Sequence, residues 1–157
     1  MNKPNIQRIA LALASLLAIT FVLAAPAMAS TTQSFHASFV ELGFVPGSPY
    51  SCGSGTISEL GHVANQCILF NACGPNCHVR TITFDDGSTL VIHESIVGMI
   101  SPGESSAAGA HAPLFLEITQ TIVDGTGRFV GATGAGTGTV NTVAGSVIIA
   151  SGTITLP

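Results

Sequence analysis

Hydrophobic and polar residues alternate with a period of two along much of the chain beyond residue 30, a pattern typical of β-strands. Segments rich in Val, Ile, Thr and Phe recur between clusters of Gly, Pro, Asn and Asp, with no competing helical period. The pattern predicts eight strands: 33–42, 55–58, 62–70, 78–84, 89–97, 114–123, 128–140 and 147–156. Such a series favours an all-β, eight-stranded antiparallel up-and-down β-barrel, because closure removes the exposed edges. A two-sheet β-sandwich is the alternative.

The connections between the predicted strands differ in length. Asp86-Gly87 is a two-residue hairpin signal, and Ala144-Gly145 is a second candidate turn. The stretches 43–54 and 98–113 contain Pro, Gly and Ser, and we expect both to be longer, exposed loops.

The N-terminus has the three parts of a secretory signal peptide: Lys3 and Arg8, an apolar run over 9–23, and Ala27-Met28-Ala29. The run is shorter than the roughly 20 residues that span a bilayer, which disfavours a membrane anchor. We predict cleavage after Ala29, a secreted or periplasmic protein, and a single barrel domain over 30–157. That domain has two arginines against eight acidic residues, a net charge of −6, and no lysine. Nucleic acid and anionic membranes are therefore excluded as expected partners.

Four cysteines in an exported chain predict a disulfide framework: Cys52, Cys67, Cys73 and Cys77. A hairpin turning at residues 59–60 would place Cys52 opposite Cys67 and leave Cys73 with Cys77. A hairpin centred on Ala72 would instead join Cys67 to Cys77 and leave Cys52 for Cys73. His62 and His78 lie near these thiols and make zinc an alternative, but the cysteine spacing does not match familiar zinc patterns, so we expect no metal.

Candidate chemistry depends on which polar side chains point into the barrel. Glu41 shares a strand face with Phe35 and Phe39, and Glu94 shares one with Leu90, Ile92 and Ile96, whereas His93 lies on the opposite face. Burial of either carboxyl would raise its pKa and suit it to general acid or base work, so both are candidate catalytic residues. The alternative is that each carboxyl points to solvent at a strand end or edge. The strand after residue 132 has glycines on one face, which we expect to line a cavity: Gly134, Gly136 and Gly138.

A glycine-rich turn precedes that strand. Its residues are Asp124, Gly125, Thr126, Gly127, Arg128, Phe129, Gly131 and Gly134. Two glycines either side of Thr126 suit a tight reversal, and we expect Asp124 and Arg128 to pair across it.

This turn, read as Gly125-Thr126-Gly127-Arg128-Phe129 and then Ala132-Thr133-Gly134, resembles the turn of the dirigent and allene oxide cyclase barrel families. Small secreted bacterial proteins carry similar segments. The resemblance implies an eight-stranded barrel with an apolar central cavity, often assembled as dimers or trimers, that confines hydrophobic reactive intermediates. Asp124 and Thr133 depart from the family pattern. No catalytic residue is carried over, because the single tyrosine, Tyr50, lies outside the matched segment.

These observations lead to a first hypothesis of a secreted barrel that binds a small hydrophobic molecule in its central cavity. An allene oxide cyclase-like or dirigent-like cyclase or isomerase is the alternative, and a non-catalytic extracellular structural or interaction protein is the third. We expect no cofactor. The partners left open are the small molecule and a second or third copy of the chain.

Overall fold

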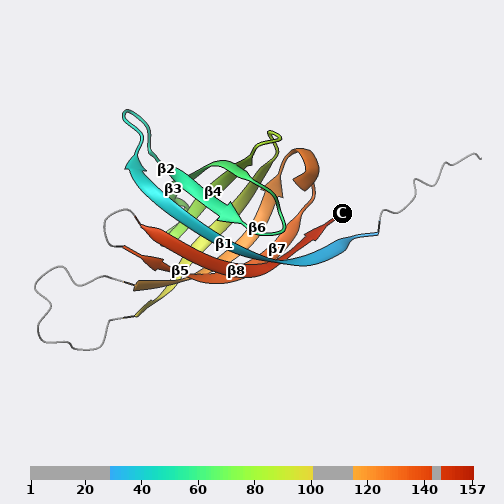
Figure 1. The fold of residues 1–157 in the computed structure, drawn as a ribbon. Helices are drawn as coiled ribbons and strands as arrows, with labels where there is room; N and C mark the ends of the chain where they lie inside the picture. Colours follow the sequence, from blue (N-terminus) through green and yellow to red (C-terminus); the bar gives the residue numbers. More distant parts are fainter. Residues whose placement is uncertain (1–28, 101–114, 143–145) are drawn as a thin grey trace, which may run out of the picture.

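The computed structural model describes residues 29–100, 115–142 and 146–157. Within these ranges it has eight β-strands and one short 3₁₀ helix (Figure 1). The elements are β1 Thr31–Phe44, β2 Tyr50–Ile57, β3 Val63–Gly74, β4 Cys77–Phe84, β5 Thr89–Ile100, β6 Phe115–Gly125, η1 Gly127–Phe129, β7 Thr133–Asn141 and β8 Val147–Leu156. Each strand pairs antiparallel with the next, and β1 pairs with β8 to close the sheet. The eight-stranded up-and-down barrel is therefore confirmed, and the sandwich alternative is wrong.

The first connection is shorter than predicted. Strand β1 continues to Phe44 and β2 begins at Tyr50, so only 45–49 of the expected loop 43–54 lies between strands. In the sequence, the glycines of β2 are typical of a loop. In the structure they lie within a strand and let β1 and β2 approach each other closely. A Cβ at Gly53 would lie 1.8 Å from the Val40 carbonyl oxygen, so a larger residue would push β1 and β2 apart.

The glycine-rich turn also differs from the prediction. Residues 127–129 form η1, and β7 begins at Thr133 rather than at 128. Gly127 (φ 60°) and Gly131 (φ 76°) have the left-handed backbone conformation that favours glycine. This conformation differs from that of a strand, so β7 begins only after Gly131. The Asp86-Gly87 turn is present, with Gly87 at φ 79°. Ala144-Gly145 and residues 101–113 of the second expected loop lie outside the described residues.

Two disulfides join the cysteines as the first predicted pairing had it. Cys52 and Cys67 lie opposite each other on β2 and β3, and Cys73 and Cys77 close the β3–β4 hairpin. Both bonds are consistent with folding in an oxidising compartment. The signal peptide stays a prediction, since residues 1–28 are outside the described part. No helix in that described part is long and apolar enough to span a membrane.

Inward-facing residues divide the barrel interior into two halves. Where β4 ends and β5 begins, the interior is apolar, and its buried side chains include Leu60, Phe84, Leu90, Phe129 and Ile154. The glycine face of β7 also points inward, and the alternating residues Thr133, Ala135, Thr137 and Thr139 are exposed. Side chains from other strands lie against these glycines. A Cβ at Gly136, for example, would lie 3.3 Å from both the Phe35 ring and the Gln120 amide oxygen.

Candidate functional site

The other half of the interior holds a buried polar cluster of five side chains. Its members are Glu41, Gln66, Arg80, Glu94 and Gln120. Glu41 lies toward the end of β1, Gln66 lies near the beginning of β3, and Arg80, Glu94 and Gln120 lie near the middle of β4, β5 and β6. We call the end of the barrel at which β1, β3 and β5 finish and β4 and β6 begin the polar end. Each side chain points inward because it shares a strand face with apolar residues that pack in the interior. Arg80, for example, lies on the same face of β4 as Ile82 and Phe84.

Arg80 is the centre of the polar cluster and is 0% exposed. Its Nε and Nη2 donate to the two carboxylate oxygens of Glu94 at 3.1 and 3.0 Å, and Nη2 also donates to Glu41 Oε1 at 3.0 Å. Nη1 donates to the amide oxygen of Gln66, and the guanidinium lies 5.1 Å from the Phe39 ring centroid. A buried arginine without such partners would cost several kcal/mol, so the five side chains form one unit.

The two carboxyls of the cluster differ in acidity. Burial raises the pKa of Glu41 above its usual value of 4.5, and the attraction of Arg80 only partly offsets this. Burial acts on Glu94 in the same direction, but the charge and hydrogen bonds of Arg80 and the Gln120 amide outweigh it and lower the Glu94 pKa. Glu94 is therefore the fixed counter-ion of Arg80, and Glu41 is the carboxyl better suited to take up and release a proton.

Gln120 supplies an acceptor that has no partner. Its Nε2 donates to Glu94 Oε2 at 2.9 Å, which fixes the orientation of the amide. Its Oε1 is buried and receives no hydrogen bond from the described residues, the only buried side-chain polar atom among them in this state. A buried acceptor of this kind costs free energy until a donor reaches it. A ligand hydroxyl, an N–H group or a water molecule could satisfy it.

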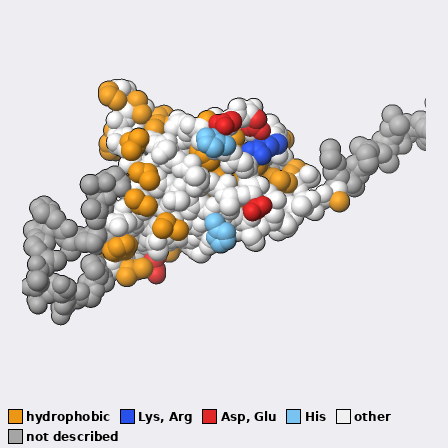
Figure 2. Space-filling view, viewed as in Figure 1, with side chains coloured by type: hydrophobic (Ala, Val, Ile, Leu, Met, Phe, Trp, Pro, Cys, Tyr) orange, Lys and Arg blue, Asp and Glu red, His pale blue; other side chains and the backbone are white. Residues whose placement is uncertain are grey.

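Exposed hydrophobic side chains surround the polar end. They belong to the end of β1 with the following turn, to β2 and β3, and to the end of β5, and they are Leu42, Phe44, Val45, Tyr50, Phe70, Val97, Met99 and Ile100. Figure 2 shows hydrophobic side chains gathered at this side of the molecule. Phe44 packs on Phe70 at 5.7 Å between ring centroids, and Phe70 packs edge-on against His78 at 5.0 Å. These exposed side chains, which we call the apolar rim, lead to His78 and Glu41, the least buried polar groups here at 9% and 7% exposed.

The glycine-rich turn lies at the opposite, apolar end and closes it. Phe129 is buried against Phe84 at 4.8 Å between ring centroids, and the Arg128 guanidinium lies over both rings. Arg128 pairs with Asp86 at 3.0 Å rather than with Asp124, whose carboxylate accepts from the Gly125 N–H. The expected pairing of Asp124 with Arg128 is therefore wrong. These contacts give the turn a structural role.

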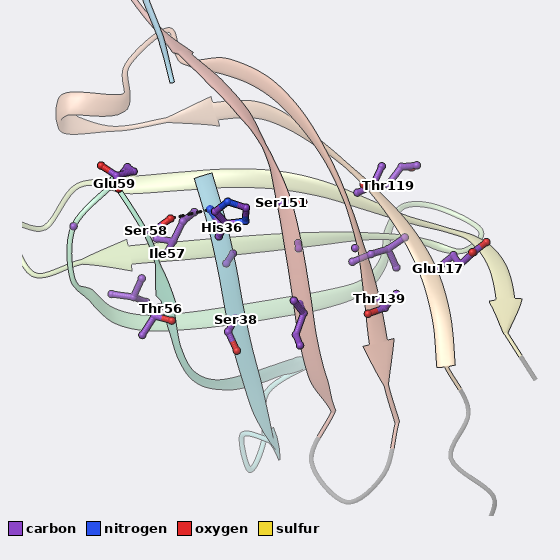
Figure 3. A pocket seen from close by; sticks show the side chains of 18 of the residues that line it. His36, Ser38, Thr56, Ile57, Ser58, Glu59, Glu117, Thr119, Thr139 and Ser151 are labelled. Carbon is purple, nitrogen blue, oxygen red and sulfur yellow. Dashed lines mark hydrogen bonds between the residues drawn. The ribbon is translucent and has the colours of Figure 1, made fainter. Parts of the chain in front are cut away.

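A groove of about 1140 Å³ lies on the outer face of the barrel (Figure 3). Outward side chains of β1, β2, β6, β7 and β8 line it, and many bear hydroxyls: Ser38, Thr56, Ser58, Thr119, Thr137, Thr139 and Ser151. His36 lies among them, and its backbone N–H donates to Ser58 Oγ at 2.9 Å. Among the described residues, the lining includes Glu59 and Glu117 and no arginine or lysine. This groove is a second surface with room for a molecule, but it lacks the buried charges of the polar end.

The structure brings together the two carboxyls nominated from the sequence, Glu41 and Glu94, on one arginine. Sequence reasoning did not select Arg80, Gln66 or Gln120. For Arg80 and Gln120 a signal was present, because Arg80 shares its strand face with Ile82 and Phe84, and Gln120 shares its face with Ile118 and Ile122. Among the predicted cavity-lining glycines, Gly136 faces the cluster and Gly138 also borders the outer groove.

Comparison with known proteins leaves the function to be argued from this site. No protein-family model matches the chain, and no curated protein matches it in sequence. Among solved structures, that of the pterocarpan synthase dirigent protein GePTS1 matches with 8% sequence identity and a TM-score of 0.32. The match covers 81% of this chain and 89% of that one. Similarity this low assigns neither a family nor an activity.

Proposed function

We propose that the protein binds a small, largely apolar molecule at the polar end of the barrel. The observation that carries this proposal is the position of an exposed apolar rim directly beside a buried charged cluster. The apolar body of the ligand packs on the rim around Phe44 and Phe70. Its polar group reaches Glu41 and His78, and a donor on it can satisfy the Gln120 amide oxygen. Exposed apolar patches of this kind commonly mark binding surfaces.

The proposed site selects ligands by charge and by shape. Burial lowers the pKa of His78 below its usual value of 6.5, although the charge of Glu94 opposes this, so the neutral imidazole is favoured near pH 7. With Arg80 satisfied by two carboxyls, the site offers no free positive charge to an anion. A neutral ligand with a hydroxyl group therefore fits better than a carboxylate or phosphate.

Thermal unfolding of the purified chain in the presence of a library of neutral apolar alcohols and phenols tests this proposal. A ligand at one hundred times its Kd should raise the free energy of unfolding by about 2.7 kcal/mol. Phe44→Ser should weaken binding at least tenfold. Val130→Ser is the matched control, because Val130 is 62% exposed against 67% for Phe44 but lies at the other end of the barrel. Equal affinities in the two variants would contradict the proposed location, and a library without any binder would contradict the proposed function.

Glu41 supports a second candidate, a cyclase or isomerase that acts on the bound molecule. Burial raises its pKa above the usual value, which favours proton uptake, and Arg80 fixes its position. If this candidate is correct, Glu41→Gln abolishes turnover of a bound substrate and changes its affinity little. Glu94→Gln should instead disturb both, because Glu94 holds Arg80 in place. Full turnover by Glu41→Gln would eliminate the catalytic role.

A further inference from the structure

The β3–β4 hairpin carries a group of metal-ligating atoms outside the polar cluster. The sulfurs of Cys73 and Cys77 and an imidazole nitrogen of His93 all lie within 4.8 Å of one another. The three residues come from the ends of β3 and β4 and from the neighbouring β5, and all are partly buried. As a disulfide, the two sulfurs cannot act as thiolate ligands. Once reduced, they would present two soft ligands beside an imidazole.

We propose that reduction of the Cys73–Cys77 disulfide creates a zinc site formed by Cys73, Cys77 and His93. A thiol reductant supplies two electrons and two protons and is itself oxidised to a disulfide, leaving two cysteine thiols. Zinc then binds both sulfurs as thiolates and releases two protons to solvent. Three protein ligands leave the fourth tetrahedral position to water, an arrangement known from open zinc sites.

Hydrogen bonds hold the hairpin in place independently of its disulfide. The Asn76 carbonyl accepts from the Ile96 N–H of β5 at 2.9 Å, and the Asn71 side chain accepts from the Asn76 N–H at 3.2 Å. The N–H of Asn71 in turn donates to His78 Nδ1 at 3.0 Å. The two sulfurs therefore stay near His93 after the bond opens. Pre-positioned ligands lower the ordering cost of metal binding.

The two disulfides differ in what their loss would do. Cys52–Cys67 joins two strands across a separation of 15 residues, whereas Cys73–Cys77 spans 4 residues within one hairpin. Opening the smaller loop releases less chain entropy to the unfolded state, so the barrel should survive it. In the described part of the chain, no comparable group of three ligands surrounds Cys52 and Cys67.

The structure also distinguishes His93 from the two histidines that the sequence suggested as zinc ligands. His62 Nδ1 pairs with Asp85 at 2.9 Å and lies on the turn before β3, toward the apolar end. His78 uses Nδ1 to accept from Asn71 and packs its ring on Phe70. His93 lies on the outer face of β5 opposite Val79, two positions along β4 from Cys77.

The test is zinc binding by the full protein after mild reduction, with alkylation and peptide mapping to identify the opened disulfide. We expect two free thiols at Cys73 and Cys77, one zinc per reduced chain, and no zinc on the oxidised chain. Cobalt in place of zinc should give the visible absorption of a tetrahedral thiolate site. His93→Ala should weaken zinc binding more than tenfold, and His62→Ala should leave it unchanged.

Four results would overturn the proposal. The first is a reduced chain that binds no zinc. The second is a His93→Ala variant with the affinity of the unsubstituted protein, which would leave a dithiol without the imidazole. The third is zinc binding that persists in Cys73→Ser/Cys77→Ser. The fourth is simultaneous opening of both disulfides. None of these outcomes depends on the apolar ligand, so this proposal and the proposed function can fail separately.

Discussion

The two ends of the barrel interior are built from the same alternating strands but are filled in opposite ways. At the apolar end, Phe84, Leu90 and Phe129 pack together under a turn that closes the barrel. In the polar cluster, five inward positions among apolar neighbours such as Phe39 and Ile118 hold an arginine, two glutamates and two glutamines. Burial of apolar side chains stabilises a fold directly, whereas a buried charged group at best balances its desolvation cost. The comparison indicates that the apolar end stabilises the barrel and that the polar end is the part suited to function.

Removal of Arg80 should produce the largest effect. Arg80→Met leaves Glu41 and Glu94 buried without their counter-ion, and we expect a loss of about 3–5 kcal/mol in the free energy of unfolding at neutral pH. Urea denaturation of the variant and the unsubstituted protein measures this loss.

The control for that experiment removes all the charges together. Arg80→Met/Glu41→Gln/Glu94→Gln has no buried ion, so it should regain about half of the lost stability or more. A triple variant as unstable as the single one would mean that Arg80 acts mainly through its packing on Phe39, which lies beneath its guanidinium.

A smaller and pH-independent effect is expected at the apolar end. Ile154 is 0% exposed and lies in the apolar core. Ile154→Val removes one methylene group and should cost about 0.5–1.5 kcal/mol, the same at every pH at which the protein is folded. Denaturation at several pH values checks both the size and its constancy. A cost that varied with pH would show that the two halves of the interior are coupled.

The smallest expected effect is the contribution of Glu41 to the pH dependence of the free energy of unfolding. Its pKa is raised in the folded state, so the folded protein binds this proton more tightly than the unfolded chain does. The resulting stability is present at low pH and is lost as pH rises from about 4.5 through the raised pKa. Glu41→Gln removes this loss, and the variant should gain stability relative to the unsubstituted protein as pH rises through that window.

Glu94 should show the opposite sign. Its lowered pKa contributes stability that is present above 4.5 and is lost as pH falls through the folded-state value. Parallel pH series of urea denaturation on Glu41→Gln and Glu94→Gln check both signs. If the difference in unfolding free energy from the unsubstituted protein changes with pH in the same direction for both variants, the different roles assigned to the two carboxyls are contradicted.

Strand alternation predicted the fold and part of the site. The period of two placed Glu41 and Glu94 on apolar strand faces and His93 on the opposite face of its strand, and the hairpin register paired Cys52 with Cys67. The structure shows that the faces with the two glutamates point inward. The same alternation pointed to Arg80, but an arginine is so seldom buried that its inward position is hard to accept before its partners are known. Gln66 and Glu94 come from β3 and β5, the neighbours of β4 in the sheet, but Glu41 comes from β1, which does not pair with β4. A linear pattern does not show which strands face each other across a barrel.

Backbone irregularities account for the remaining differences. Strand β3 shifts register between Val63 and Asn65, which places Gln66 inward although simple alternation from Val63 would not. Strand β2 extends through glycines that resemble a loop in the sequence, because Gly53 allows β1 to approach. Bulges and close approaches depend on contacts between distant strands, so they cannot be predicted from local composition.

The ladder between β1 and β8 also determines when this chain can finish folding. Thr31 pairs with Leu156 and Val40 with Val147, so the first strand to be synthesised has its final partner at the C-terminal end of the barrel. Every other ladder joins strands that are neighbours in sequence. Until the last strand is made, β1 exposes an unpaired edge that can recruit another chain. A chain without β8 would keep that edge open, so β8 must be synthesised before the barrel can protect this edge from aggregation.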